Sequence, residues 1–252
     1  MISTSTNPLS NVISLGREIP WLELDQDRRS FQREFVRLAL ECPGFRGRVL
    51  DIGCGGELPA ALEIFEGQFG TLDGVDPSPA VMSHPLLERR WQGAFETSAV
   101  PADAYDLAYA YNVLEHIADP RPFFEKVFSA LKPGGVFVGL TPNAGHPFAV
   151  LSRSIELLGL KGFARARIGR SEETGEMAVN DYPAYYRSNS PRAIRQAIHG
   201  LGFRRATYYY FPCLQWDTYF PRVLRWAPRL YDYVLGTRVS SLMQIFIVQL
   251  EK

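Results

Sequence analysis

Short apolar runs alternate with amphipathic segments through the middle of the chain. The first run, Val49-Leu50-Asp51-Ile52, ends in glycines, as expected for a strand buried on both faces of a parallel sheet. The same pattern predicts further strands at residues 71–75, 91–95, 105–111 and 136–140. Apolar residues at helical spacing predict helices at residues 21–40, 58–67, 79–87 and 122–131. Strands that alternate with helices indicate βαβ units and a doubly wound parallel sheet.

The pattern changes after the fifth predicted strand. Residues 143–187 are mixed in character, and Ser190-Pro191 then predicts the capped start of a helix that ends near Gly200. Two more strands are predicted at residues 203–211 and 242–250, as an antiparallel pair. The sequence therefore predicts an α/β fold with a Rossmann-like, doubly wound, seven-stranded sheet that is mostly parallel.

This organisation predicts a single domain. Its expected parts are a mobile arm, an N-terminal helix, a core, an insertion and a C-terminal region: residues 1–20, 21–44, 45–142, 143–187 and 188–252. At 252 residues with 46% hydrophobic content, the chain is long enough to bury one large core.

Charge and composition narrow the expected partners. Lys plus Arg and Asp plus Glu both number 27, so no overall field attracts a polyanion, and we expect no nucleic-acid partner. The chain has no apolar run of about 18 residues that would span a membrane. The Ser- and Thr-rich start does not resemble a secretory signal, and three cysteines in no paired motif favour a reduced, cytoplasmic setting. No cluster of His, Cys or Asp has metal-ligand spacing, so no metal is predicted.

Candidate chemistry begins at the end of the first strand. In Asp51-Ile52-Gly53-Cys54-Gly55, glycines let the backbone bend and approach a nucleotide-like ligand, and Asp51 can orient the loop or accept from a cationic amine. Asp76 ends the second strand, where a carboxylate can accept hydrogen bonds from both hydroxyls of a ribose. The dehydrogenase fingerprint fits less well, because its third glycine would fall on Leu58.

These residues resemble the motifs of the class I S-adenosylmethionine-dependent methyltransferases. Asp51 to Gly55 resembles the family's first motif, and Gly74-Val75-Asp76-Pro77-Ser78 resembles its second. Tyr105-Asp106-Leu107 with Asn112 to Ile117 resembles the fourth-strand motif of small-molecule members, and Leu131-Lys132-Pro133-Gly134-Gly135 the turn before strand five. The match runs in order over about residues 45–143.

The resemblance implies S-adenosylmethionine as cofactor and S-adenosylhomocysteine as product. It implies a cofactor site formed by these residues: Asp51, Gly53, Cys54, Gly55, Asp76, Pro77, Ala94, Phe95, Glu96 and Asn112. The sequence departs from the family at Glu57, where a third glycine is usual, and at Ala94, where an aspartate often meets the adenine. Phe95 has plain core packing as its alternative role.

The expected reaction is in-line methyl transfer to a small-molecule acceptor, at a hydroxyl or carboxyl oxygen rather than nitrogen. His116 follows strand four and is the first candidate base, with His146, just past strand five, as the other. The alternative for His116 is a structural histidine at the start of a helix, and for His146 a solvent-facing histidine in a loop. Two other hypotheses remain at this stage: a regulatory protein that binds the cofactor without catalysis, and a methyltransferase for tRNA or protein.

Two regions are expected to shape the acceptor side. The resemblance places a lid in the insertion, where Tyr182, Tyr185 and Tyr186 are candidate acceptor ligands, and the basic stretch from Lys161 to Arg170 is read as a solvated helix face. An aromatic- and arginine-rich segment follows, from Tyr208 to Tyr233. It has three interpretations: a wall of the acceptor pocket, a homodimer surface or a membrane-surface patch.

Overall fold

One mixed sheet forms the centre of the protein. The computed structural model describes residues 10–14, 30–157, 182–212, 220, 222–236 and 238–252. The strand order is β1-β7-β8-β6-β5-β2-β3-β4. The strands are β1 (Ser10–Ser14), β2 (Arg48–Ile52), β3 (Thr71–Asp76), β4 (Arg90–Gln92), β5 (Tyr105–Tyr111), β6 (Leu131–Pro142), β7 (Arg205–Phe211) and β8 (Ile245–Glu251). All neighbouring strands are parallel except for β8, which is antiparallel to both β6 and β7.

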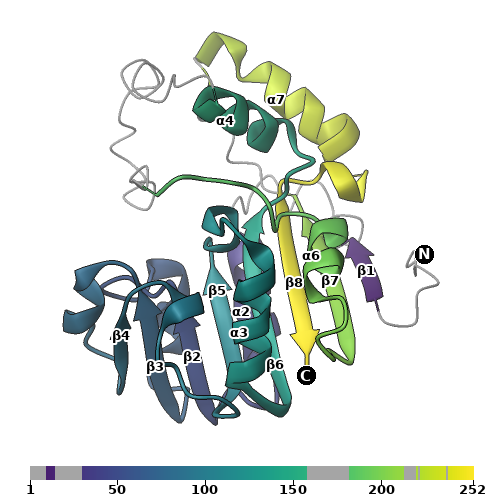
Figure 1. Cartoon of the computed structure of the whole chain (residues 1–252). Coiled ribbons are helices and arrows are strands. Elements are labelled where there is room, and N and C mark those ends of the chain that lie inside the picture. Colours follow the sequence, from purple (N-terminus) through teal and green to yellow (C-terminus); the bar gives the residue numbers. More distant parts are fainter. Residues whose placement is uncertain (1–9, 15–29, 158–181, 213–219, 221, 237) are drawn as a thin grey trace.

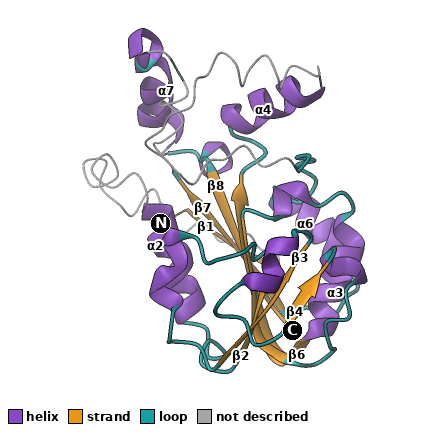
Figure 2. Cartoon of the chain, turned by 90° about the vertical axis from the view of Figure 1, so that its left-hand side faces the viewer, coloured by secondary structure: helices purple, strands orange, loops and turns teal. Residues whose placement is uncertain are grey.

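Helices cover both faces of this sheet, as alternating side chains of the buried strands require. One apolar cluster packs α2 (Ser30–Leu40) and the 3₁₀ helix η2 (Ala60–Phe65) against one face. The other packs α3 (Pro120–Ala130) and α6 (Pro191–Ile198) against the opposite face, and Figure 2 shows the sheet between the two layers. Neighbours in β2 divide accordingly, with Val49 in the first cluster and Leu50 in the second.

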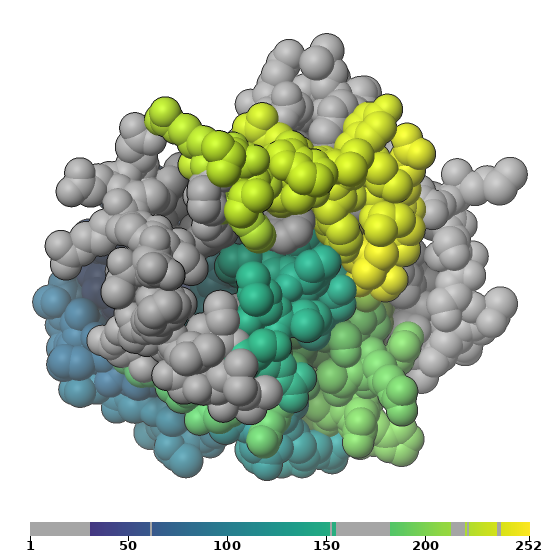
Figure 3. Space-filling model, turned by 90° about the horizontal axis from the view of Figure 1, so that it is seen from above, coloured from purple at the N-terminus to yellow at the C-terminus, as the bar shows by residue number. Residues whose placement is uncertain are grey.

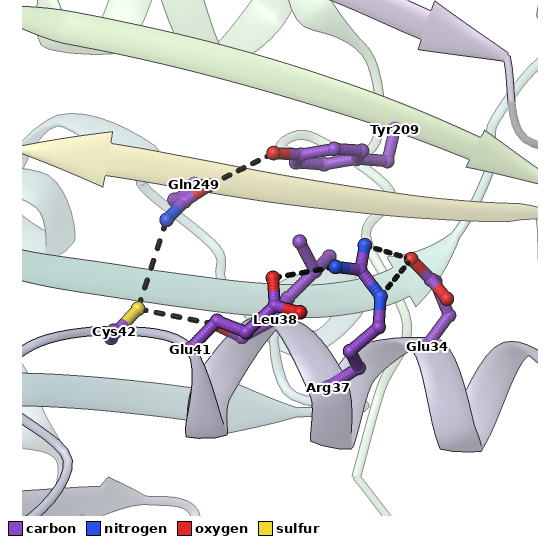
Figure 4. Close-up of polar contacts among 7 residues, drawn as sticks. All are labelled: Glu34, Arg37, Leu38, Glu41, Cys42, Tyr209 and Gln249. Carbon is purple, nitrogen blue, oxygen red and sulfur yellow. Dashed lines mark hydrogen bonds and ion pairs between the residues drawn. The ribbon is translucent and has the colours of Figure 1, made fainter.

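Polar contacts fix α2 on its face of the sheet. The Cys42 thiol just after the helix donates to the Leu38 carbonyl at 3.2 Å and accepts from Gln249 Nε2 on β8 at 3.7 Å, and Tyr209 on β7 donates to Gln249 at 3.0 Å (Figure 4). Burial raises the pKa of this thiol to about 11, so Cys42 is a structural and not a reactive cysteine. Arg37 bridges Glu34 and Glu41 on the outer surface of the helix.

The observed elements confirm the predicted fold class. The seven predicted strands all form, and β7 and β8 are the expected antiparallel pair. Ser190 caps α6 by accepting from the Ala193 amide at 3.3 Å, as its sequence predicts.

Two local features differ from the prediction, and one predicted feature lies partly outside the described residues. Ser10–Ser14 lies in the expected N-terminal arm but forms an eighth strand, β1, parallel to β7. The helices expected at 58–67 and 79–87 are instead short 3₁₀ helices, η2 and η3 (Pro79–Ser83). Pro59 and Gly67 flank η2, and Pro85 follows shortly after η3, so both segments are short. Residues 15–29, which include the start of the predicted helix, lie outside the described residues.

Three further helical segments lie beyond the carboxyl ends of the parallel strands. They are α4 (Pro147–Leu157), α7 (Trp226–Tyr231) and η8 (Asp232–Gly236). Figure 1 shows α4 and α7 above the sheet, at the edge where the parallel strands end. Because β8 is antiparallel, its first residue Ile245 lies opposite Pro142 at this same edge. The segment that precedes β8 is thereby brought to the edge where ligands bind in doubly wound sheets.

Candidate active site

The glycine loop after β2 borders open space at Gly55 and packs against Val113 at Gly53. Gly53 and Gly55 adopt φ values of 79° and 61°, which favour glycine. A Cβ on Gly53 would lie 2.3 Å from Val113 Cγ2, whereas one on Gly55 would meet nothing within 4 Å. The backbone at Gly55 is therefore accessible from outside, and Val113 closes the loop on the other side.

Asp76 ties this loop to the turn after β3. One carboxylate oxygen accepts from the Gly55 amide at 2.9 Å, and the other accepts from the Ser78 amide at 2.7 Å. Each carboxylate oxygen has a second lone pair. The buried Asp76 carboxylate can therefore position the loop and still accept from a ligand hydroxyl.

A second carboxyl group lies beneath the loop. Asp51 is 3% exposed and accepts a hydrogen bond from the Tyr109 hydroxyl at 2.8 Å. Burial raises the pKa of Asp51 to about 7, against the opposing effect of the Tyr109 hydrogen bond, and the negative charge of Asp76 raises it further. A positively charged ligand in the loop would stabilise the ionised form of Asp51.

The other residues expected around the cofactor differ in their positions. Asn112, with φ 56°, is exposed directly after β5, and its backbone amide donates to the Leu140 carbonyl at 2.9 Å. Pro77 and Ala94 are exposed. Glu96, two residues after Ala94, is half-buried. Phe95 is buried, and its ring centroid lies 5.4 Å from that of Phe123. This is the core packing that the sequence offered as its alternative role.

Cys54 contributes its backbone to the loop and its side chain to packing. Its thiol is buried near Gly74, where an added Cβ would come within 2.7 Å of the sulfur. Burial, followed by the charges of Asp51 and Asp76, raises the pKa of the thiol far above its usual range. The thiol is therefore inert, and any contact of Cys54 with a ligand would be through its backbone.

A buried polar network joins the 3₁₀ helix η5 (Leu114–His116), β6 and the segment before α6. Glu115 accepts from the Thr141 hydroxyl at 2.7 Å, and Thr141 accepts from Asn189 Nδ2 at 2.6 Å. Asn189 also donates to the Pro142 carbonyl at 2.9 Å. The Glu115 carbonyl accepts from the amides of Tyr185 and Tyr186, at 2.7 and 3.1 Å. This network holds the end of the insertion against the strand ends.

His116 lies beside this network. Its Nδ1 is 3.0 Å from the Pro183 carbonyl oxygen, and its ring centroid is 6.3 Å from that of Tyr182. Burial, and then the negative charge of Asp76, raise the pKa of Tyr182, so its hydroxyl lies within electrostatic reach of the cofactor loop. Tyr182 therefore lies next to His116 and close enough to Asp76 to be affected by its charge.

His146 has different surroundings. It is 1% exposed, its Nδ1 accepts from the Phe148 amide at 3.1 Å, and its ring packs edge-on against Tyr231 at 5.4 Å. Burial lowers the pKa of His146 to about 3. The neutral ring therefore joins the start of α4 to the end of α7.

Tyr186 lines a small hollow at the same edge of the sheet. The hollow has a volume of about 140 Å³ and is lined by Ala144, Ala149, Val150, Arg153, Ser154 and Tyr186. Tyr185 lies outside it, partly exposed, with the Arg187 guanidinium 5.7 Å from its ring centre. Of the three predicted acceptor tyrosines, only Tyr186 lines this hollow, while Tyr182 faces His116.

Sequence reasoning missed three residues of the site. Tyr109 is the register partner of Asp51 on β5, and a polar pair on neighbouring buried strands was the signal available for it. Thr141 and Asn189 reach Glu115 through the tertiary fold, and nothing in their local sequence indicates this contact. Among the residues that the structure describes, no three His, Cys, Asp or Glu side chains are grouped so that they could hold a metal ion.

The strand order and the glycine loop define the class of protein. An antiparallel strand between the two parallel strands β6 and β7, with a glycine loop and buried carboxylates after β2 and β3, is the arrangement of S-adenosylmethionine-dependent methyltransferases. The chain belongs to the family described as "Methyltransferase domain", whose model matches residues 24–206. This membership favours an enzyme over a regulatory protein that only binds the cofactor.

The curated relatives are methyltransferases of small molecules or of unspecified substrates. The chain is 27% identical over 206 residues to a ubiquinone biosynthesis O-methyltransferase of Rhodopseudomonas palustris, a match that covers 78% of this chain and 74% of that protein. It is 36% identical over 109 residues to the protein of the same name from Cronobacter sakazakii, covering 40% of this chain and 45% of that one. Most matches among these relatives thus span about half of their length.

Solved structures share the fold. An S-adenosylmethionine-dependent methyltransferase of Archaeoglobus fulgidus superposes with a TM-score of 0.56 at 16% identity, covering 92% of this chain and all of that one. Phosphoethanolamine N-methyltransferase 2 of Haemonchus contortus gives a TM-score of 0.57 at 14% identity, covering 89% and 52%. At these identities the likeness is one of fold alone.

The residues present fit S-adenosylmethionine as cofactor. The open backbone at Gly55 admits a ligand, and the buried carboxyl groups of Asp51 and Asp76 suit one that carries positive charge and ribose hydroxyls. Asp76 would hold the ribose, and the loop of Gly53 to Gly55 would hold the amino acid part. When bound, the cofactor supplies an electrophilic methyl carbon.

Proposed function

We propose that this methyltransferase methylates a hydroxyl oxygen of a small-molecule acceptor, with His116 as general base. The observation that carries the proposal is the contact between His116 Nδ1 and the Pro183 carbonyl at 3.0 Å. A carbonyl can only accept, so Nδ1 carries the proton and Nε2 is left with its lone pair. This tautomer is the one that can take a proton from an acceptor.

The contacts of the neighbouring residues indicate the part that each would take in the proposed reaction. In a transfer that breaks the carbon–sulfur bond of the bound cofactor and leaves S-adenosylhomocysteine, the proton of the acceptor hydroxyl would pass to His116 Nε2. Glu115, next in sequence and buried, accepts from the Thr141 hydroxyl at 2.7 Å, and this contact fixes the turn that carries the imidazole. The ring of Tyr182 lies beside that of His116, and the backbone of Tyr185 and Tyr186 is fixed by the Glu115 carbonyl.

The relatives support oxygen as the acceptor atom. Several are named ubiquinone biosynthesis O-methyltransferases, which places a hydroxyl-directed reaction in the same family. An amine acceptor would already be a nucleophile once neutral, and a carboxylate needs no base at all. A fixed base next to the strand ends therefore supports a hydroxyl acceptor over these two.

The test measures methyl transfer to simple phenols, alcohols, carboxylic acids and primary amines, by release of S-adenosylhomocysteine. We expect turnover with hydroxyl acceptors, and a loss of about 10²- to 10⁴-fold in kcat for His116→Gln with unchanged cofactor affinity. His199→Gln is the matched control, since His199 ends α6.

A companion variant separates the two candidate bases. His146→Phe keeps the ring contact with Tyr231 and should retain turnover, because the buried His146 is held by α4 and α7. Transfer to amines alone, or a collapse of turnover in His146→Phe together with full activity in His116→Gln, would overturn the proposal.

A further inference from the structure

Large apolar side chains are exposed on one continuous segment above the sheet. We call this segment, residues 222–236 with 238 and 239, the α7 face. Val223 is 78% exposed, Trp226 63% and Leu230 53%, far more than core residues of the same types. The other exposed apolar residues of this face are Leu224, Tyr233, Val234, Leu235 and Val239.

Arginines are interspersed with these apolar residues. Arg222, Arg229 and Arg238 are exposed and Arg225 is half-buried. Arg238 lies with its guanidinium 5.6 Å from the ring centre of Tyr233. The one acidic residue between positions 222 and 239, Asp232, is buried, so the exposed charges of the α7 face are all positive.

The α7 face lies at the edge of the molecule that carries the active site. Tyr231 joins it to the rest of the protein, by its ring contact with His146 and by a hydrogen bond from its hydroxyl to the Leu242 carbonyl at 3.0 Å. Figure 3, viewed from above, shows the yellow-green atoms of this segment spread across that side. No helix in the described ranges is long and apolar enough to cross a membrane.

We infer that the α7 face binds to the surface of an anionic lipid membrane. A helical segment with Trp, Tyr and Leu beside arginines places aromatic rings at the level of the lipid headgroups and arginines against their negative charge. A second copy of the chain is a poorer partner, because a twofold contact would place like-charged arginine clusters against each other. The inference concerns docking alone and goes beyond the proposed reaction.

The experiment measures co-sedimentation of the full chain with vesicles. Vesicles of phosphatidylcholine mixed with phosphatidylglycerol should bind the protein, and vesicles of phosphatidylcholine alone should bind it far less. Because exposed charges are screened by salt, binding to the anionic vesicles should weaken at about 0.5 M salt. No acceptor or methyl transfer is involved, so this result is independent of the proposed function.

Two variants separate the apolar from the electrostatic contribution. Trp226→Ser with Leu230→Ser should lower the partition coefficient at least about tenfold. Arg222→Gln with Arg229→Gln and Arg238→Gln should lower it about 100-fold, at about fivefold per arginine. Ile64→Ser is the matched control, since Ile64 is 56% exposed on η2, outside the α7 face. Calorimetric titration with S-adenosylmethionine verifies that each variant is folded.

The inference is supported if the protein binds anionic vesicles in a salt-sensitive way, and if this binding is lost in both variants but kept in Ile64→Ser. Absence of vesicle binding, or equal binding to neutral vesicles, overturns it. So does sedimentation as a dimer that the Trp226→Ser, Leu230→Ser variant converts to a monomer while no vesicle is bound. In that case the occupant of the α7 face is a second copy of the chain.

Discussion

Replacement of Asp51 by asparagine should change how the stability of the protein depends on pH. In the folded protein, burial raises the pKa of this carboxyl from 3.8 to about 7. In the unfolded chain the carboxyl is exposed and returns to its ordinary pKa. The substitution keeps the oxygen that accepts from Tyr109 but removes the titration.

The sign of the effect follows from which state holds the proton. Between about pH 4 and pH 7 the folded carboxyl is protonated while the unfolded one is ionised, so raising the pH lowers the free energy of unfolding. The rise in the pKa from 3.8 to about 7 corresponds to about 4 kcal/mol once both states are ionised. The cofactor-free wild type should therefore lose stability relative to Asp51→Asn by about 1.4 kcal/mol per pH unit within this window.

Urea unfolding of both proteins at several pH values checks this expectation. The quantity to follow is the difference between their free energies of unfolding, because other titrating groups contribute equally to both. A difference that stays constant between about pH 5 and pH 8 would refute the linkage of Asp51 to stability. Addition of S-adenosylmethionine should stabilise the wild type more at the upper end of this range, because the ionised carboxyl of Asp51 attracts the positive charge of the ligand.

Two further predictions concern the loop and the polar network. Gly53→Ala should cost about 3 kcal/mol or more in urea unfolding, from its φ of 79° and the contact with Val113 at 2.3 Å, whereas Gly55→Ala should cost about 1 kcal/mol yet weaken binding of S-adenosylmethionine in calorimetry. Equal stability of the two variants would contradict the packing at Gly53. Asn189→Ala should lower thermal stability by about 2 kcal/mol, because the Thr141 hydroxyl and the Pro142 carbonyl both lose a donor. Its neighbour Ser188 is a control, since its buried hydroxyl has no partner within the described part of the chain and Ser188→Ala should change stability little.

Most of the sheet could be predicted because its strands are marked locally. Buried parallel strands are largely apolar runs, and turn-forming residues follow them: Gly53 after β2, Pro77 after β3 and Asn112 after β5. β1 could not be predicted in this way. Its sequence, Ser10 to Ser14, has only Val12 and Ile13 as apolar residues, and its partner β7 lies far along the chain. Pairing at such a distance is a property of the tertiary fold.

The two sides of the active site differ in the same respect. The grouping of Gly53, Gly55 and Asp76 could be predicted, because the glycines follow β2 and Asp76 ends its neighbour β3. The acceptor side could not be predicted, because Glu115, Thr141 and Asn189 come from three segments that only the fold brings together.

The aromatic segment divides into a buried part and an exposed part. Tyr208 to Tyr210 are buried in β7, Trp226 is exposed on the α7 face, and Trp216 and Tyr219 lie outside the described residues.

The antiparallel strand β8 also has a consequence for the folding kinetics. Strands β2 to β6 pair with one another at smaller separations in the chain than the separation between β6 and β8, so this part of the sheet can form by more local nucleation. The insertion of β8 between β6 and β7 requires closure of a long loop, as the hydrogen bond from Asn143 to Met243 across 100 residues illustrates. We therefore expect the cofactor side to become ordered first and the acceptor side in a slower phase, so that a refolding intermediate would already bind S-adenosylmethionine before it can methylate anything.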